Sequence, residues 1–255
     1  MNREGTSKPT TITTIIGSTF VVVLLLYFGL TTTTTKTTQE NYYNRNNILN
    51  GMVIFAQEED KAPPVVKSSK IIEFSGINYA DVLNSTDINL NSFTVSVWFN
   101  TAMNVTGRDV AFLINKGGFG SDRSGFNLNY GIWLNNKEQV GGGFETLTGD
   151  DYFIASQAPY ADGVWHNAIL TFDEKLHLLK LYVDGLEVAT NSTNIGITPD
   201  TTGKQPVRLG ANSFEDKGPI NGNYTGQLDD IQVWDYVFTK EQVIDLFQRE
   251  SSIDR

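Results

Sequence analysis

Two pairs of adjacent acids are the first candidates for chemistry in this 255-residue chain, Asp150–Asp151 and Asp229–Asp230. A retaining glycosidase needs two carboxyl groups about 5 Å apart, one on each side of the scissile bond. Neighbouring residues of a strand point to opposite faces of a sheet, so neither pair supplies such an arrangement from a strand. These acids therefore do not predict hydrolysis of this kind.

His166 is the one plausible general base. The chain has two histidines and no cysteine, which excludes a cysteine nucleophile, a thiolate metal cluster and a three-His zinc site. Strand alternation puts His166 on the same face as Ala168 and Leu170, so we expect a buried, hydrogen-bonded histidine rather than a catalytic one. The Gly-rich segment 117–125 follows a strand and opens no helix, which indicates a turn rather than a phosphate loop.

Strand alternation also predicts a binding surface. In FNLNYGIWLN (126–135) the residues Asn127, Asn129 and Trp133 share one face, and in FTVSVWFN (93–100) Trp98 points outward. Tyr182 is directed the same way in its own strand. Aromatic rings stack on sugar rings, while amides donate to and accept from sugar hydroxyls. These five residues predict a glycan-binding surface, unless loops or a C-terminal helix cover the two tryptophans.

The elements that must position these residues are mostly strands. From residue 68 onward, short runs with a period of two are separated by Gly, Asn, Asp and Pro. No ten-residue helical pattern intervenes, so we expect an all-β, two-sheet antiparallel jelly-roll sandwich. The predicted strands are Ile71–Phe74, Phe93–Asn100, Val110–Asn115, Phe126–Leu134, Val140–Glu145, His166–Asp173, Leu178–Val183 and Leu228–Trp234.

One helix is expected after the last strand. Thr239 and Gln242 have the spacing of a capping box, in which each side chain bonds the backbone N–H of the other residue. Val243, Leu246 and Phe247 then lie on one helical face. The helix should dock on the sandwich through that face.

Two long segments resemble a known family. The segments DGVWHNAILTFDEKLHLLKLYVDGLEVAT (162–190) and GQLDDIQVWDYVFTKEQVIDLF (226–247) are similar to the core and the closing strand and helix of laminin-G-like and concanavalin A-like lectin/glucanase domains. IIEFSGINYADV (71–82) and FTVSVWFN (93–100) resemble the family's first strands more loosely. The resemblance implies a jelly roll and carbohydrate recognition.

The resemblance also implies a bound metal ion and makes a glucanase activity one possibility to consider. Such sandwiches often hold a structural Ca²⁺, and the resemblance puts its carboxylate ligand at Asp229 and its carbonyl ligands around Gly76–Asn78. The alternative is that Asp229 caps a turn or pairs with a basic group. Glucanases of this shape carry E-x-D-x-x-E or E-x-D-x-E on one strand face, and this chain has no complete cluster: Glu187 follows Asp184, but Tyr182 stands where the first Glu is needed.

The N-terminal part predicts a membrane anchor. Ile12–Leu30 contains 19 residues without a charge, and as a helix it would reach about 28 Å, close to the thickness of a bilayer core. Arg3 and Lys8 precede it, which places the N-terminus in the cytoplasm. We therefore expect a tail (1–11), a transmembrane segment (12–30), a Thr/Asn-rich disordered stalk (31–67) and an extracytoplasmic domain (68–250). The alternative is a cleaved signal peptide, because the apolar run Phe20–Leu26 is as short as an h-region.

The charge and the sequons fit an exported protein. The net charge of −10 argues against nucleic-acid binding through phosphates. Residues 1–67 hold six basic and five acidic residues, so the net negative charge of the chain lies in the predicted exported domain. Four N-x-[ST] triplets, which are also expected by chance in a chain this rich in Asn and Thr, predict glycosylation at Asn84, Asn104, Asn191 and Asn223.

The leading hypothesis is a membrane-tethered extracytoplasmic module that binds a carbohydrate or cell-surface glycopolymer and performs no reaction. One alternative is a structural or adhesive surface protein that binds another protein, as laminin-G-like domains also do. The other is a polysaccharide hydrolase or lyase. The sequence does not choose the ligand, since one fold hosts many functions.

Overall fold

The computed structural model describes residues 42–43, 71–82, 88–118, 124–213, 220–253 and 255. The predicted membrane span and almost all of the stalk lie outside these residues. Within the described part, no helix has the length and apolar character needed to cross a membrane. The described residues belong to one compact unit, Gln39–Arg255.

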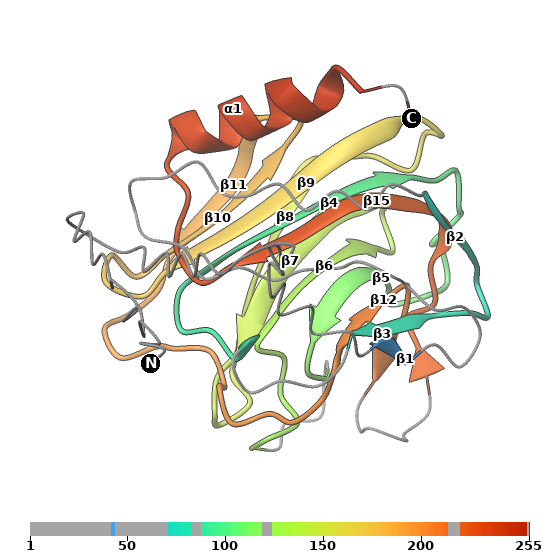
Figure 1. The fold of residues 1–255 in the computed structure, drawn as a ribbon. Coiled ribbons are helices and arrows are strands. Elements are labelled where there is room, and N and C mark those ends of the chain that lie inside the picture. The colour runs from blue at the N-terminus through green and yellow to red at the C-terminus, as the bar shows by residue number, and fades with distance from the viewer. Residues whose placement is uncertain (1–41, 44–70, 83–87, 119–123, 214–219, 254) are drawn as a thin grey trace, which may run out of the picture. The chain divides into compact units, whose positions relative to one another are not determined.

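The domain is a sandwich of two antiparallel sheets with one helix outside it (Figure 1). All neighbouring strands of the two sheets pair antiparallel. The seven-stranded sheet has the order β1 (Tyr42–Tyr43), β3 (Ala80–Val82), β12 (Val207–Leu209), β5 (Val110–Lys116), β6 (Tyr130–Asn135), β7 (Gln139–Glu145) and β8 (Asp151–Pro159). The six-stranded sheet has the order β11 (Leu186–Ser192), β10 (Leu178–Val183), β9 (Trp165–Asp173), β4 (Phe93–Asn100), β15 (Thr225–Trp234) and β2 (Ile72–Ser75). A further pair consists of β13 (Asn212–Ser213) and β14 (Ile220–Asn221).

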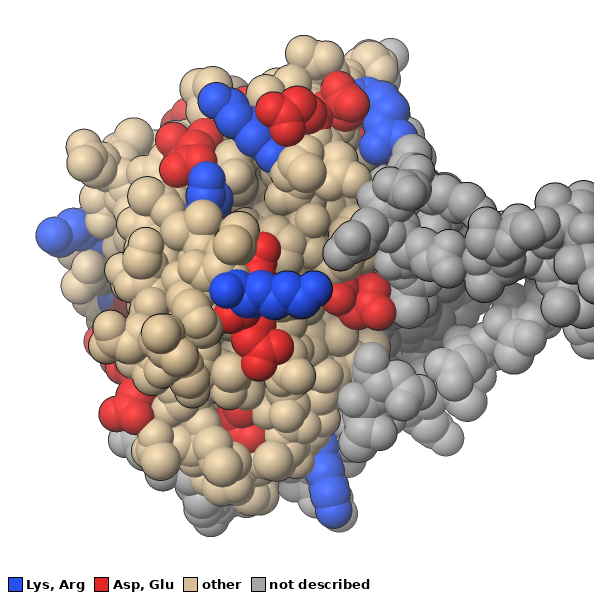
Figure 2. All heavy atoms as spheres, turned by 90° about the vertical axis from the view of Figure 1, so that its left-hand side faces the viewer, with Lys and Arg blue, Asp and Glu red and all other residues tan. Residues whose placement is uncertain are grey.

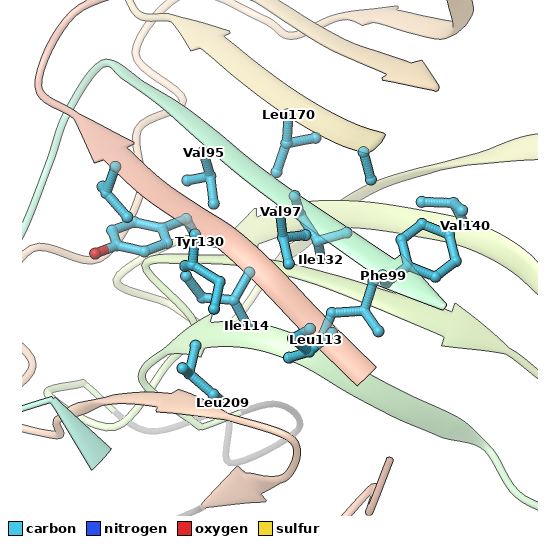
Figure 3. Packing of buried hydrophobic residues seen from close by; sticks show 14 of the residues in the cluster. Val95, Val97, Phe99, Leu113, Ile114, Tyr130, Ile132, Val140, Leu170 and Leu209 are labelled. Carbon is cyan, nitrogen blue, oxygen red and sulfur yellow. The ribbon is translucent and has the colours of Figure 1, made fainter. Parts of the chain in front are cut away.

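The core lies between the two sheets, as the alternating pattern predicts. Every second residue of β4, such as Val95 and Val97, joins one buried cluster with Ile132 of β6 and Leu170 of β9 (Figure 3). Each fully buried side chain of this size contributes about 1.5–3 kcal/mol relative to an exposed one. The two-sheet antiparallel prediction is therefore confirmed.

The predicted strand bounds agree with the observed ones to different degrees. The bounds of β4 and β10 are those predicted, whereas β6 begins at Tyr130 rather than Phe126. Two long strands that the sequence analysis missed, β8 and β11, are edge strands of their sheets and are mostly exposed or half-buried. With little surface to bury, an edge strand has little reason to alternate apolar and polar residues.

The helix α1 (Lys240–Ser251) covers the outer face of the six-stranded sheet. Its capping box is confirmed: the Gln242 backbone N–H donates to Thr239 Oγ1, and the Thr239 backbone N–H donates to Gln242 Oε1. Val243 and Leu246 are buried in a cluster with Ile169, Tyr182, Trp234, Tyr236 and Phe238. The predicted docking of this helix is therefore confirmed.

Charged residues are mixed by sign on the face seen in Figure 2, where acidic and basic side chains lie next to one another among uncharged ones. The described residues form no continuous basic stripe on this face. Such a stripe is the electrostatic signature of proteins that bind nucleic acid through its phosphates.

Replacing Thr239 by Ala removes the acceptor that caps the first turn of α1. We expect the free energy of unfolding to fall by about 1 kcal/mol, measured by urea denaturation of the full chain. The matched control is Gln248→Ala, since Gln248 is exposed on the same helix and should be near neutral. Equal losses in the two variants would contradict the capping role.

Candidate functional site

The prediction that Trp98 lies on an open face is wrong. Trp98 lies in β4 beneath α1 and is 4% exposed. Phe247 stacks on its ring with a centroid distance of 5.7 Å, and its Nε1 donates to Glu250 Oε2. Tyr182 is also buried, in the cluster under the first half of α1. Both side chains do point away from the core, but the helix covers the face that they form.

Trp133 also points away from the core, on the outer face of the seven-stranded sheet. It packs there in a small cluster with Phe112, Leu128 and Phe153, and is 5% exposed. The indole lies on Gly141, where a Cβ atom would come within 2.5 Å of Nε1. The expected exposure of Trp133 is therefore wrong as well.

The two predicted asparagines tie loops together. Asn127 Nδ2 donates to the carbonyl oxygen of Thr146 and to Asp200 Oδ2, at 2.9 and 3.1 Å. Asn129 accepts from the backbone N–H of Leu90 and donates to its carbonyl oxygen. Both are buried, and their amides satisfy groups that would otherwise lack partners. Both asparagines precede β6, and Leu128 between them packs with Trp133, so the strand alternation predicted from residue 126 does not hold here.

The predicted calcium ligands do not come together. Strand pairing sets Ile72 opposite Leu228 and Ser75 opposite Thr225, so the turn Gly76–Asn78 continues away from Asp229. Four residues of strand separate the two places, roughly 13 Å. Asp229 Oδ2 instead lies 3.4 Å from Arg255 Nε. This contact matches the alternative that Asp229 pairs with a basic group. In the described ranges, no group of three or more His, Cys, Asp or Glu residues could hold a metal ion.

The four sequons differ in accessibility. Asn104 and Asn191 are exposed, and Asn223 is half-buried. Asn84 lies outside the described residues. Glycosylation stays a prediction at each position.

His166 is buried and hydrogen-bonded, as predicted. Its Nδ1 lies 2.7 Å from Asp184 Oδ2, and its Nε2 lies 3.1 Å from Asp162 Oδ1. Burial acts to lower the pKa of His166, but the hydrogen bonds and charges of the two carboxylates outweigh it and raise that pKa. Both ring nitrogens are engaged, so this imidazole ties the β8–β9 loop to the β10–β11 turn.

A polar row that the sequence analysis missed crosses the outer face of the seven-stranded sheet. The register places Arg208 of β12 opposite both Asp81 of β3 and Asn115 of β5, so the three side chains share one face. Arg208 Nε and Nη2 donate to the two oxygens of Asp81, at 2.6 and 2.8 Å. The guanidinium also lies over the ring of Tyr79, 4.3 Å from its centroid. We call Tyr79, Asp81, Asn115 and Arg208 the Arg208 cluster.

The Arg208 cluster has hydrogen-bonding capacity that the described residues leave unused. Arg208 is 2% exposed, and its Nη1 has no hydrogen-bond partner among them. The same is true of Asn115 Oδ1, whereas Asn115 Nδ2 donates to the carbonyl oxygen of Gly117. Buried polar atoms are normally paired, so one donor group and one acceptor on the same face are suited to a polar ligand. Asn115 is 1% exposed, so the cluster reaches the surface only through Asp81, whose side chain is 23% exposed, and through half-buried Tyr79.

The sequence holds only a faint signal for this cluster. Arg208 stands between Val207 and Leu209 in a three-residue strand, which indicates an outward side chain. Its partner Asp81 is 127 residues away in the chain, and only the strand order brings the two together.

Comparison with known proteins supports the family assignment. A model of the concanavalin A-like lectin/glucanases superfamily matches residues 74–244. No curated protein sequence matches the chain. Similar solved structures include the CBM40 module of a Ruminococcus gnavus IT-sialidase, alone and bound to α2,3-sialyllactose. The first has a TM-score of 0.58 at 17% identity and covers 72% of this chain and 98% of that one.

Parts of larger proteins are similar in fold. The NanB sialidase of Streptococcus pneumoniae has a TM-score of 0.54 at 18% identity, with 68% of this chain and 26% of that chain covered. The binding domain of Paraclostridial Mosquitocidal Protein 1 has a TM-score of 0.52 at 16% identity, with 71% and 43% covered. At these identities the likeness concerns the fold. Because the family model spans most of the sandwich and the start of α1, this chain belongs to the concanavalin A-like lectin/glucanase superfamily.

Proposed function

We propose that this protein is a non-catalytic carbohydrate-recognition module, tethered to a membrane by Ile12–Leu30 and displayed outside the cytoplasm. Its glycan site is the Arg208 cluster. The observation that carries the proposal is the pairing of an unused Arg208 Nη1 with an unused Asn115 Oδ1 on one sheet face. A buried donor beside a buried acceptor matches the mixed hydrogen bonding of a sugar.

The guanidinium indicates an acidic sugar as the first ligand to test. Arginine binds carboxylates through directed, charge-assisted hydrogen bonds, and the pair with Asp81 already fixes its plane. The ring of Tyr79 adds an aromatic surface beside it. A similar module in Ruminococcus gnavus is bound to sialyllactose, which supports sialylated glycans as the starting class.

Three acidic residues of the sandwich are engaged in structural bonds. Glu145 is buried and accepts from the backbone N–H of Leu128. Glu187 pairs with Lys180 across β10 and β11, and Asp184 holds His166. These engagements support binding without hydrolysis as the proposed role.

Titration of the full chain in detergent with α2,3-sialyllactose, α2,6-sialyllactose and lactose tests the glycan site. We expect the sialylated sugars to bind and lactose to bind at least tenfold more weakly. Asn115→Ala and Tyr79→Ala should each weaken binding about five- to tenfold, since each removes one contact of order 1 kcal/mol. Arg208→Gln should abolish binding, and isothermal calorimetry measures all three.

The matched control is Lys180→Gln, which removes a basic residue from β10 of the other sheet and should leave affinity unchanged. Circular dichroism confirms folding, because Arg208→Gln leaves Asp81 without its partner. Absence of sugar binding by the folded chain would refute the proposal, and retained binding in the Asn115 and Tyr79 variants would refute the site. The same titration in the presence of a chelator tests whether sugar binding needs the predicted Ca²⁺.

Membrane tethering has its own test. After expression in cells, the full chain should stay in the pellet through alkaline carbonate extraction. Replacing Val22 and Leu25 by Lys should release it, because central lysines make membrane insertion costly. Release of the unmodified chain would favour the signal-peptide alternative.

His166 should give the domain a pH-dependent stability. Because its folded-state pKa is raised, its contribution is fully present below the unfolded pKa of about 6.5 and is lost as the pH rises through the folded value. His166→Gln should therefore destabilise the chain more at pH 5.5 than at pH 8.5, as measured by urea denaturation. In Asp162→Asn the NMR titration of His166 should move to lower pH, and an unmoved titration would argue against the ion pair.

A further inference from the structure

The two halves of α1 are held in different ways. The first part of α1, up to Leu246, is anchored by apolar burial of Val243 and Leu246 against the sheet. The second half is anchored by a carboxyl group, because Glu250 is 1% exposed although it lies near the end of the helix. A buried acid at a docking surface makes the docking depend on whether that acid is charged.

Glu250 is surrounded by groups from β4, β15 and the end of the chain. Its Oε2 accepts from Trp98 Nε1 and its Oε1 accepts from Gln232 Nε2, at 2.5 and 2.6 Å. Arg255 lies with its guanidinium 3.7 Å from the Trp98 ring and donates to the Glu250 carbonyl oxygen. Phe247 stacks on the same indole. The end of α1 and Arg255 thus form one cover over Trp98.

The charges around Glu250 are of both signs. Asp230 of β15 pairs with Arg255 Nη2 at 2.6 Å, and Asp229 lies beside Arg255 Nε. Burial, and to a smaller extent the charge of Asp230, raises the pKa of Glu250. The hydrogen bonds from Trp98 and Gln232 and the charge of Arg255 only partly offset this rise, so the pKa is about 7. The folded state therefore keeps Glu250 protonated up to about pH 7, whereas the ordinary Glu value is 4.5.

The sign of the effect follows from that rise. Stabilisation by the protonated form is complete below the ordinary Glu value of 4.5 and is lost as the pH rises through about 7. Ionised Glu250 is better solvated when the helix end is lifted. Docking of the second half of α1 therefore weakens as the pH rises, while the apolar first half has no such dependence.

We propose that Phe247–Ser251 together with Arg255 forms a pH-operated lid, which is closed on Trp98 in mildly acidic conditions and opens as Glu250 ionises. Opening uncovers the indole and the neighbouring outer face of β4 and β15. This face belongs to the six-stranded sheet, so the lid is separate from the Arg208 cluster. The aromatic surface that strand alternation predicts at Trp98 is thus exposed only when the lid is open.

Hydrogen–deuterium exchange of the full chain in detergent tests the lid. After correction for intrinsic exchange rates, protection of a peptide covering 247–253 should fall by up to about 70-fold from pH 5 to pH 8, given pKa values of about 7 closed and 4.5 open. A peptide covering 240–246 should change little. In Glu250→Gln, which is neutral at every pH, the change in 247–253 should disappear.

Glu241→Gln is the matched control, because Glu241 is exposed on the same helix, and it should keep the wild-type response. Trp98→Phe removes a hydrogen bond that favours the ionised acid, so it should move the loss of protection to higher pH. Equal protection of 247–253 at the two pH values in the unmodified chain would overturn the proposal. So would an unchanged pH response in Glu250→Gln.

Discussion

Apolar contact between the inner faces of the two sheets is the constraint on which the rest of this structure depends. Phe93, Val95, Val97 and Phe99 of β4 meet the inward residues of β6 and β9 in one buried cluster. Once one side of each strand is committed to that contact, the register is set, because a shift by one residue would exchange the two faces. Every outward side chain then has a defined place.

The two outer faces have different roles. On the six-stranded sheet, α1 covers the aromatic residues that point outward, including Trp98, Tyr182 and Trp234. On the seven-stranded sheet, an aromatic group around Trp133 lies on the same face as the Arg208 cluster. A covered face gives stability and, through Glu250, sensitivity to pH. On the other face, Arg208 Nη1 and Asn115 Oδ1 are buried without hydrogen-bond partners among the described residues.

The Arg208 cluster shows how a site forms without a motif. Asp81, Arg208 and Asn115 come from three different strands, one residue from each, and Tyr79 directly precedes β3. The prediction was right about the outward direction of Trp133 but wrong about its neighbours. Leu128 packs against Trp133, whereas Asn127 and Asn129 precede β6 and bond the loops of Asp200 and Leu90.

The sequence by itself determined the strands of the core, the capped helix and the two-sheet class, because local alternation and capping depend on residues close together in the chain. It also determined that His166 is buried beside polar partners. Only the tertiary structure decided that Trp98 and Trp133 are covered, that Asp229 meets Arg255 rather than the turn Gly76–Asn78, and that Arg208 meets Asp81 and Asn115. These outcomes depend on strand order and on what packs over each face, and both arise from contacts between segments far apart in sequence.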